Sequence, residues 1–224
     1  VGAGYVAGGT VTLTQTITYA GACRGLDWRM LPPAGWSYDS GGGAEGPVKP
    51  TVGTTSLLEW TWPTVPASPV TFTVTLRVPA AQSGGQTLAS LAVFGVAAGQ
   101  INLLAKPDPL VVAHIVPHDA DTDRDLRLSL VELTRLIELY NTRQGTNRTG
   151  AYKVDTLGED GFNPDPARAG SAVVTLMRTH SADSNRNGSI NLLELTRVIE
   201  YYNTRSGSTR TGAYHAVRKG EAAT

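Results

Sequence analysis

The sequence predicts a mixed, two-domain fold in which an all-β domain precedes a mainly α-helical domain. Residues 1–110 hold five Lys or Arg and five Asp or Glu, whereas residues 111–224 hold fourteen of each. All four tryptophans lie in the first part. Alternating apolar and polar residues dominate that part, and two near-copies of one segment dominate the second. We therefore expect one domain over 1–113 and another over 114–224.

The first domain is predicted to be a sandwich of short strands. In residues 10–19, Val11, Leu13 and Ile17 alternate with threonines, which is the period of a half-buried strand. Four more apolar runs follow, separated by Gly, Pro, Ser and Asn turn residues, at 56–62, 70–78, 87–96 and 109–113. Short strands at near-regular intervals are typical of an immunoglobulin-like β-sandwich.

One uncharged stretch, residues 88–105, is long enough to be mistaken for a membrane span. Gly95, Gly99 and Asn102 interrupt it, so we expect two strands around a turn and no membrane-spanning segment. Basic and acidic residues are equal in number in both parts of the chain. This balance gives no reason to expect nucleic acid or an anionic membrane as a partner.

The tryptophans admit two roles. Trp60 and Trp62 lie two residues apart on a predicted strand, so their side chains share one face. They could stack on a sugar or fill the core of the sandwich, and the role in the core is favoured. Trp28 and Trp36 have the same ambiguity.

The second domain is built from two near-copies, residues 118–154 and 180–217. The second copy contains DSNRNGSINLLE (183–194), which fits the EF-hand calcium pattern D-x-[DN]-x-[DN]-G-x5-E at every defined position. The first contains DTDRDLRLSLVE (121–132), which fits everywhere except at the glycine. The duplicated match predicts two calcium sites. The alternative is two solvated acidic turns that cap helices.

The spacing of the pattern follows from the chemistry of calcium, which takes six to eight oxygen ligands. Loop position 7 supplies a backbone carbonyl, position 9 often acts through water, and position 12 supplies a bidentate carboxylate. The expected ligands are Asp121, Asp123, Asp125, Arg127, Ser129 and Glu132 in the first loop and Asp183, Asn185, Asn187, Ser189, Asn191 and Glu194 in the second. Four of the first six are carboxylates, against two of the second six, so charge favours the first site.

Position 6 of such a loop makes a sharp turn with positive φ. Gly188 suits that position in the second loop, but Leu126 occupies it in the first. A left-handed conformation costs a residue with a Cβ about 1–2 kcal/mol. The first site is therefore expected to be strong but strained, and disordered when no metal is bound.

Each loop runs into a predicted amphipathic helix, over 129–143 and 191–205, and no helical pattern precedes the first loop. Neither helix is long enough to be stable alone in water, so each apolar stripe needs a partner. We expect the two stripes to pack together in one core. Their residues are Leu133, Leu136, Ile137 and Tyr140, and Leu195, Val198, Ile199 and Tyr202.

The duplicated loop–helix arrangement, over 118–143 and 180–205, resembles the dockerin family, whose paired units bind calcium and dock onto cohesin domains of extracellular scaffolds. The resemblance implies the same calcium ligands and a cohesin-like partner. The copies lie sixty-two residues apart, about twice the dockerin spacing. Many dockerins read their partner with polar residues at loop positions 10 and 11. Here Leu130–Val131 and Leu192–Leu193 occupy those positions and are expected to be buried. The preceding sandwich also resembles immunoglobulin-like modules of secreted bacterial proteins.

Other polar residues could also have functional roles. Four acidic residues of one Gly/Pro-containing loop could form a third cation site, although a solvated loop is favoured. They are Asp155, Glu159, Asp160 and Asp165. His118 and His180 lie three residues before each loop's first ligand, where capping or packing is favoured over zinc binding. Asn147 begins an N-glycosylation sequon.

No nucleophile elbow, His-rich metal motif or phosphate-binding glycine loop is present, so no enzyme is predicted and calcium is the expected cofactor. A single cysteine, Cys23, excludes an internal disulfide. Calcium is plentiful outside cells, which favours an extracellular or cell-surface location, in a bacterium.

Three functions remain open. The first is a structural subunit that self-associates into a filament or surface assembly. The second is a dockerin-like anchoring module, and the third is a carbohydrate-binding module. The first is favoured because Val1–Gly9 is glycine-rich, has no reason to be ordered within one subunit, and could add to a neighbour's sheet edge.

Overall fold

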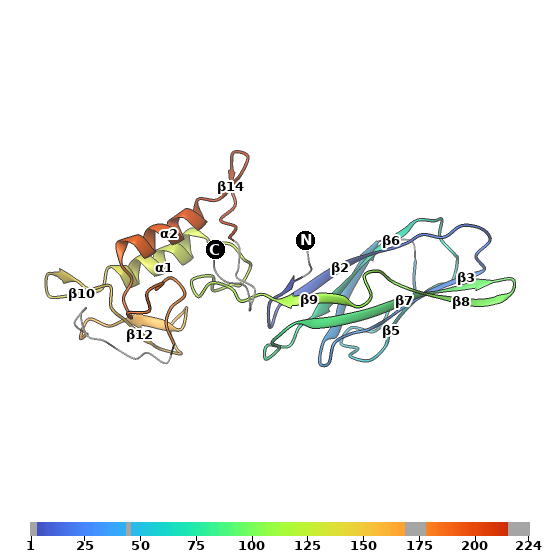
Figure 1. Cartoon of the computed structure of the whole chain (residues 1–224), viewed down its shortest axis with the longest axis horizontal. Coiled ribbons are helices and arrows are strands. Elements are labelled where there is room, and N and C mark those ends of the chain that lie inside the picture. The colour runs from blue at the N-terminus through green and yellow to red at the C-terminus, as the bar shows by residue number, and fades with distance from the viewer. Residues whose placement is uncertain (1–3, 44–45, 169–177, 215–224) are drawn as a thin grey trace. The chain divides into compact units, whose positions relative to one another are not determined.

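The computed structural model describes residues 4–43, 46–168 and 178–214, and the chain divides into two compact units between Ile115 and Val116 (Figure 1). Strands make up most of the regular structure, and the helices of the described residues lie in the second unit. Each unit has its own hydrophobic core. The structure confirms the prediction of a β-rich first part and of a second part that contains two helices.

Two β-sheets form the first unit. The larger has the strand order β1-β9-β7-β3-β5, with β8 also paired to β7, and the smaller has the order β2-β6-β4. The strands of the larger sheet are β1 (Gly4–Tyr5), β3 (Gly25–Leu31), β5 (Leu58–Trp62), β7 (Gln86–Val96), β8 (Gly99–Leu104) and β9 (Leu110–His114). Those of the smaller sheet are β2 (Thr10–Ile17), β4 (Ser37–Gly43) and β6 (Val70–Arg77).

The alternation read from the sequence fixes which face of β2 is buried. Val11, Leu13 and Ile17 are buried, while the threonines between them are exposed. On the outer face Thr12 pairs with Thr75 of β6, their hydroxyl oxygens 3.0 Å apart. Such threonine pairs stabilise neighbouring strands on a solvated face. The predicted pattern for this strand is confirmed.

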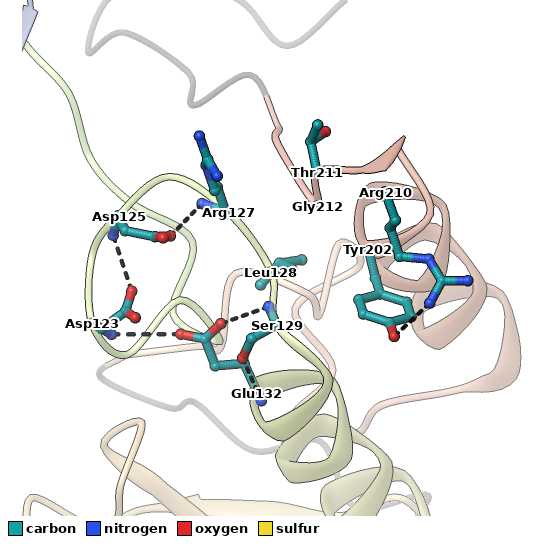
Figure 2. Close-up of a pocket in the computed structure, with 10 residues that line it drawn as sticks. All are labelled: Asp123, Asp125, Arg127, Leu128, Ser129, Glu132, Tyr202, Arg210, Thr211 and Gly212. Carbon is teal, nitrogen blue, oxygen red and sulfur yellow. Dashed lines mark hydrogen bonds between the residues drawn. The ribbon is translucent and has the colours of Figure 1, made fainter. Parts of the chain in front are cut away.

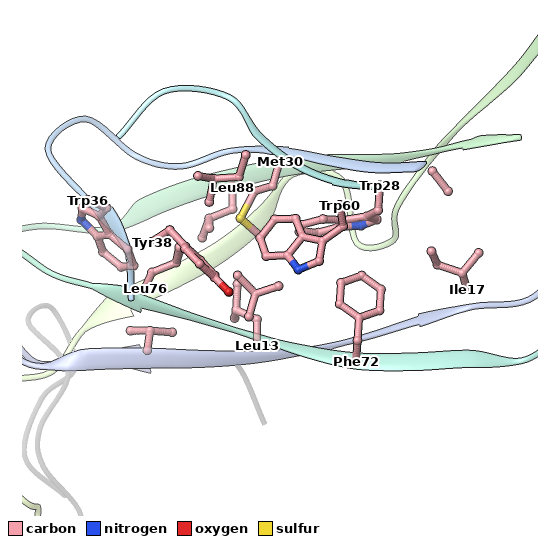
Figure 3. Packing of buried hydrophobic residues seen from close by; sticks show 14 of the residues in the cluster. Leu13, Ile17, Trp28, Met30, Trp36, Tyr38, Trp60, Phe72, Leu76 and Leu88 are labelled. Atoms are coloured by element: carbon pink, nitrogen blue, oxygen red, sulfur yellow. The ribbon is translucent and has the colours of Figure 1, made fainter. Parts of the chain in front are cut away.

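Aromatic side chains fill the space between the two sheets (Figure 3). Trp28 and Trp60 face each other across β3 and β5 with ring centroids 4.9 Å apart, and Phe72 of β6 lies 5.3 Å from Trp28. Trp36 and Trp62 are buried as well, and none of the four tryptophans is more than 2% exposed. The core reading is confirmed, so these side chains cannot form an exposed sugar platform.

Residues 88–105 form the expected pair of strands. β7 pairs with β8 from Leu91↔Leu104 to Val96↔Gly99, and its first residues pair with β9 instead. β3 and β4 have no counterpart among the predicted strands. The signal for β3 was present, because Leu26, Trp28 and Met30 alternate into the core.

The expectation that Val1–Gly9 is unordered within one subunit is wrong for the residues that the structure describes. β1 pairs in parallel with β9 of its own chain, in the register Gly4↔Ala113. Tyr5 is 1% exposed and its hydroxyl donates to the carbonyl of Gly84 at 2.5 Å. A large buried aromatic ring therefore anchors this segment within its own unit. Residues 1–3 lie outside the described residues.

The second unit contains α1 (Leu130–Tyr140) and α2 (Leu192–Tyr202). Its strands are β10 (Arg143–Gln144), β11 (Asn147–Arg148), β12 (Tyr152–Val154), β13 (Phe162–Pro164), β14 (Arg205–Ser206) and β15 (Thr209–Arg210). Both helices end before the predicted limits, because Asn141 and Asn203 cap them and a two-stranded hairpin follows each. A mainly helical unit was expected, and this is wrong for the described residues of the unit, where α1 and α2 are the two helices.

The two helices contribute to one core, as predicted. Leu133, Leu136, Leu195 and Val198 are buried in a single cluster, with Ile137, Tyr140, Ile199 and Tyr202 packed against it. Tyr152, from the end of the first repeat, and Phe162, from the segment between the repeats, belong to the same cluster. The insert that separates the copies therefore belongs to the core of the unit.

Candidate metal centres

The first predicted loop gathers carboxylates at the start of α1, and Figure 2 shows Asp123, Asp125 and Glu132 among them. Oxygens of Asp121, Asp123 and Glu132 lie within 4.8 Å of one another. Asp123 and Glu132, but not Asp121, line a cavity of about 240 Å³ together with Asp125 and Ser129. This cluster could hold a metal ion. Among the described residues it is the one group of three or more acidic, histidine or cysteine side chains so placed.

Side chains shape this loop by accepting hydrogen bonds from its own backbone. Asp121 accepts from the N–H groups of Asp125 and Leu126, at 3.1 and 2.9 Å. Asp123 accepts from Asp125 at 3.1 Å, and Asp125 accepts from Arg127 at 2.8 Å. Such short-range bonds are the reason that Asp and Asn favour turns. These bonds bend the loop so that the carboxylate oxygen atoms of its acidic side chains converge.

Glu132 joins the end of the loop to its beginning. One carboxylate oxygen accepts from the N–H of Thr122 at 2.8 Å, and the other accepts from the N–H of Ser129 at 2.8 Å. The Ser129 hydroxyl in turn accepts from the N–H of Glu132, which completes a capping box. The carboxylate is thereby held in the first turn of α1.

The second loop repeats these contacts bond for bond. Asp183 accepts from the N–H groups of Asn187 and Gly188, at 3.1 and 2.7 Å. Glu194 accepts from Ser184 and Asn191, both at 3.0 Å, and Asn191 caps α2. The six predicted positions of each loop therefore occupy equivalent places. The second loop differs chiefly in charge, because amides replace the carboxylates at two of them.

The sharp turn expected at loop position 6 is present in both copies. φ is 64° at Leu126 and 76° at Gly188, so the predicted left-handed leucine is confirmed. Position 4 is also left-handed, with φ of 61° at Arg124 and 57° at Arg186, which the sequence pattern did not indicate.

Four carboxylates of the two loops are buried without a counter-charge from the described residues. Asp121, Glu132, Asp183 and Glu194 are 3–4% exposed, and no ion pair among the described residues includes them. Burial, assisted by the nearby acidic side chains, raises the pKa of the Asp121 carboxyl despite its hydrogen bonds. Buried charges are costly unless they are paired or coordinate a metal. A bound cation would remove this penalty.

Each loop also contacts the pentapeptide RTGAY that ends the other repeat. The hydroxyl of Tyr214 donates to Asp121 at 2.6 Å, and the hydroxyl of Tyr152 donates to Asp183 at 2.6 Å. The recurrence of RTGAY at 148–152 and 210–214 is visible in the sequence, but the calcium pattern does not include it. The exact repetition of RTGAY was the only sequence signal for this contact.

The third cation site, which the sequence left as the less favoured alternative, is not assembled. Asp160, expected in a solvated loop, is buried beside Arg135 and His180, at 3.5 and 3.7 Å. Asp155 instead accepts hydrogen bonds from Leu157 and Asn163. The prediction of a solvated loop is therefore wrong for Asp160. The four acidic residues also do not converge on one site.

The two histidines have backbone roles. Nδ1 of His118 accepts from the N–H of Ala120 at 3.1 Å, and Nδ1 of His180 accepts from Ala182 at 3.0 Å. The rings lie 5.6 Å apart between the repeats. These contacts agree with capping and packing. Burial, and then the proximity of His180, lowers the pKa of His118 to about 4.

Loop positions 10 and 11 are exposed, contrary to the expectation that they are buried. Leu130 and Val131 are 61% and 68% exposed, and Leu192 and Leu193 are 63% and 79% exposed. The buried stripe of each helix begins only at position 12, so the apolar residues before it face solvent. Each repeat thus presents an apolar pair directly after its loop.

No protein-family model matches the chain, and a search of curated proteins gives no match. Within the described residues, neither helix has the length and apolar character needed to cross a membrane.

Proposed function

We propose that the second unit is a calcium-stabilised docking module of an extracellular, non-enzymatic protein, with an EF-hand-type calcium ion in each loop. The observation that carries this proposal is the pair of matching loops. Their buried carboxylates form no ion pair with a basic residue of the described part of the chain, and the two residues before each loop's last glutamate expose apolar side chains. Calcium would supply the missing charge, and the apolar pairs would supply the contact surface.

Calcium is favoured over other metals by the donor set. All twelve predicted ligand positions offer oxygen, and none is a histidine or cysteine. Oxygen ligands in an adaptable coordination geometry suit calcium, whereas zinc prefers nitrogen and sulfur and magnesium demands rigid octahedral geometry. Six candidate positions per loop match the six to eight ligands that calcium takes.

Calcium would also fix the docking surface. Glu132 and Glu194 occupy the first helical turn next to Leu130–Val131 and Leu192–Leu193, so a metal that holds the glutamate also holds the apolar pair. Exposed apolar side chains beside an ordered site are typical of protein interfaces. The partner we propose is a cohesin-like domain, following the resemblance of the repeats to dockerins.

Thermal unfolding tests the calcium part of this proposal. Calcium at a hundredfold excess over its dissociation constant stabilises a site by about 2.7 kcal/mol. We therefore expect the transition of the second unit to move to lower temperature when a chelator replaces calcium, while the transition of the sandwich stays in place. A second-unit transition that ignores the chelator would refute the proposal.

Surface plasmon resonance against immobilised cohesin domains tests the docking part. The quadruple variant Leu130→Ser/Val131→Ser/Leu192→Ser/Leu193→Ser should lose cohesin binding and keep its calcium-dependent melting. Leu157→Ser is the matched control, because Leu157 is 95% exposed in the same unit but lies outside both pairs. Equal binding by all the variants would exclude this surface.

Self-association into a polymer is a second candidate, and one observation favours it. All six residues of β8 are exposed, including Ile101, Leu103 and Leu104 at 52–57%, and the strand carries no charge. An apolar edge without charged residues readily pairs with another chain. We also propose that the first unit is an immunoglobulin-like sandwich, which its two packed sheets support.

A further inference from the structure

The pentapeptide RTGAY, at Arg148–Tyr152 and Arg210–Tyr214, runs along the metal-binding loop of the opposite repeat. The N–H of Ile190 donates to the carbonyl of Gly150 at 2.9 Å, and the N–H of Tyr152 donates to the carbonyl of Gly188 at 3.2 Å. These bonds lie on both sides of Ser189, the predicted carbonyl ligand, which bridges to Ala151. The pentapeptide therefore fixes the backbone on both sides of a ligand position.

The reverse contact has the same form. The N–H of Leu128 donates to Gly212 at 2.9 Å, and the N–H of Tyr214 donates to Leu126 at 3.4 Å. Arg127, the equivalent carbonyl ligand, bridges to Ala213. The two repeats thus exchange their pentapeptides.

The tyrosine hydroxyl of each pentapeptide joins two parts of the opposite loop. Tyr152 donates to Oδ2 of Asp183 at 2.6 Å and accepts from the N–H of His180 at 3.0 Å. Tyr214 donates to Oδ2 of Asp121 at 2.6 Å and accepts from the N–H of His118 at 2.8 Å. Each hydroxyl therefore ties the segment that enters the loop to the loop's first ligand.

A carboxylate that receives such a bond has little freedom to rotate. Oδ2 of Asp183 accepts from Tyr152 and also from the N–H of Gly188 at 2.7 Å, and the side chain is 3% exposed. Hydrogen bonds to ligating groups orient the ligands and tune metal affinity, typically tenfold or more on removal.

We propose that each calcium site is completed by the tyrosine of the opposite repeat. Tyr214 is the positioning residue for Asp121 in the first site, and Tyr152 is the positioning residue for Asp183 in the second. The inference rests on the calcium binding proposed above. It goes beyond that proposal because it makes the two repeats one binding unit, in which each repeat reaches its full calcium affinity only with the tyrosine of the other.

Calcium titration by calorimetry in single-site backgrounds tests the crossing. Glu194→Gln disables the second site and leaves the first for measurement. In that background Tyr214→Phe should weaken calcium binding about tenfold, the usual effect of one hydrogen bond to a charged group. Tyr152→Phe is the matched control and should leave the affinity unchanged. In the Glu132→Gln background the two tyrosines should exchange roles.

Amide resonances give a second measurement that does not depend on affinity. The N–H groups of Leu126 and Gly188 each donate to the first aspartate of their loop, so each reports one site. Tyr214→Phe should shift the Leu126 resonance and leave that of Gly188 in place in the calcium-loaded protein.

The outcomes separate this inference from the proposed function. A wild-type chain that takes up no calcium would overturn both. Three results would overturn the crossed arrangement alone. Calcium binding at a site could be weakened by the Tyr→Phe substitution in the same repeat, by both substitutions equally, or by neither. A merely structural tyrosine would give one of these patterns, because it would not discriminate between the sites.

Discussion

At the residue scale, the candidate sites depend on a few backbone positions that most side chains could not occupy. Gly150 and Gly212 of the exchanged pentapeptides have φ of 60° and 63°, and a Cβ on either would lie well under 3.0 Å from a carbonyl oxygen of the opposite loop. Glycine permits this approach and the left-handed turn together. The repeated glycine of RTGAY therefore has a structural cause.

Replacing Gly212 with alanine should be much more damaging than replacing Gly207. Both have positive φ, 63° and 61°, but a Cβ on Gly207 would meet nothing within 4 Å. Gly207→Ala should cost about 1–2 kcal/mol from the left-handed backbone alone. Gly212→Ala adds a steric clash and should cost about 3 kcal/mol or more. Urea unfolding of the two variants measures the difference, and equal losses would contradict the close approach.

His118 should make the stability of the second unit depend on pH. Its pKa is about 6.5 in an unfolded chain and about 4 in the fold. Between these values the unfolded chain holds a proton that the folded chain does not, so stability falls as the pH falls from about 7 toward 4. The full effect is on the order of 3 kcal/mol.

The matched variant for this pH effect is His118→Asn, which retains an acceptor for the N–H of Ala120 but cannot titrate. With calcium saturating, thermal melts between pH 7.5 and 5.0 should show a smaller loss of stability in the variant than in the wild type. The same loss in both proteins would show that His118 does not titrate on unfolding in this range.

At the scale of elements, the sequence predicted what is encoded locally. The twelve-residue loops and the helices after them follow from short-range spacing, and the strand pattern of β2 follows from alternation. The exposed Leu130 and Leu192 were misjudged because apolar character alone was taken to mean burial. Where the buried stripe begins depends on the packing of α1 against α2, which the spacing does not specify.

The exposed strand β8 gives a prediction about association. If chains pair through this edge, Leu103→Lys should abolish the pairing, because a charge on an edge strand opposes the addition of another strand. Leu103 is 57% exposed, so the substitution should not unfold the sandwich. Sedimentation at high protein concentration, with the equally exposed Val111 (58%) changed to lysine as the control, measures the effect. A wild-type chain that stays monomeric would exclude pairing through β8.

At the scale of the whole molecule, the long-range contacts were beyond the sequence pattern. That RTGAY recurs is visible in the sequence, but which loop Tyr152 or Tyr214 reaches is decided by the packing of both repeats around one core. The anchoring of Tyr5 beside β9 is equally non-local, since the contact with Gly84 spans most of the first unit. Residues that carry such contacts show no periodicity of their own.

The central claim is that the chain holds two calcium ions, one in each loop, and counting the ions tests it most directly. Native mass spectrometry at saturating calcium should give a wild-type mass with two ions bound. Glu132→Gln and Glu194→Gln should each bind one ion, and the double variant none, because each change removes the bidentate ligand of one loop. A wild-type chain without bound calcium, or variants that still hold two ions, would contradict the account.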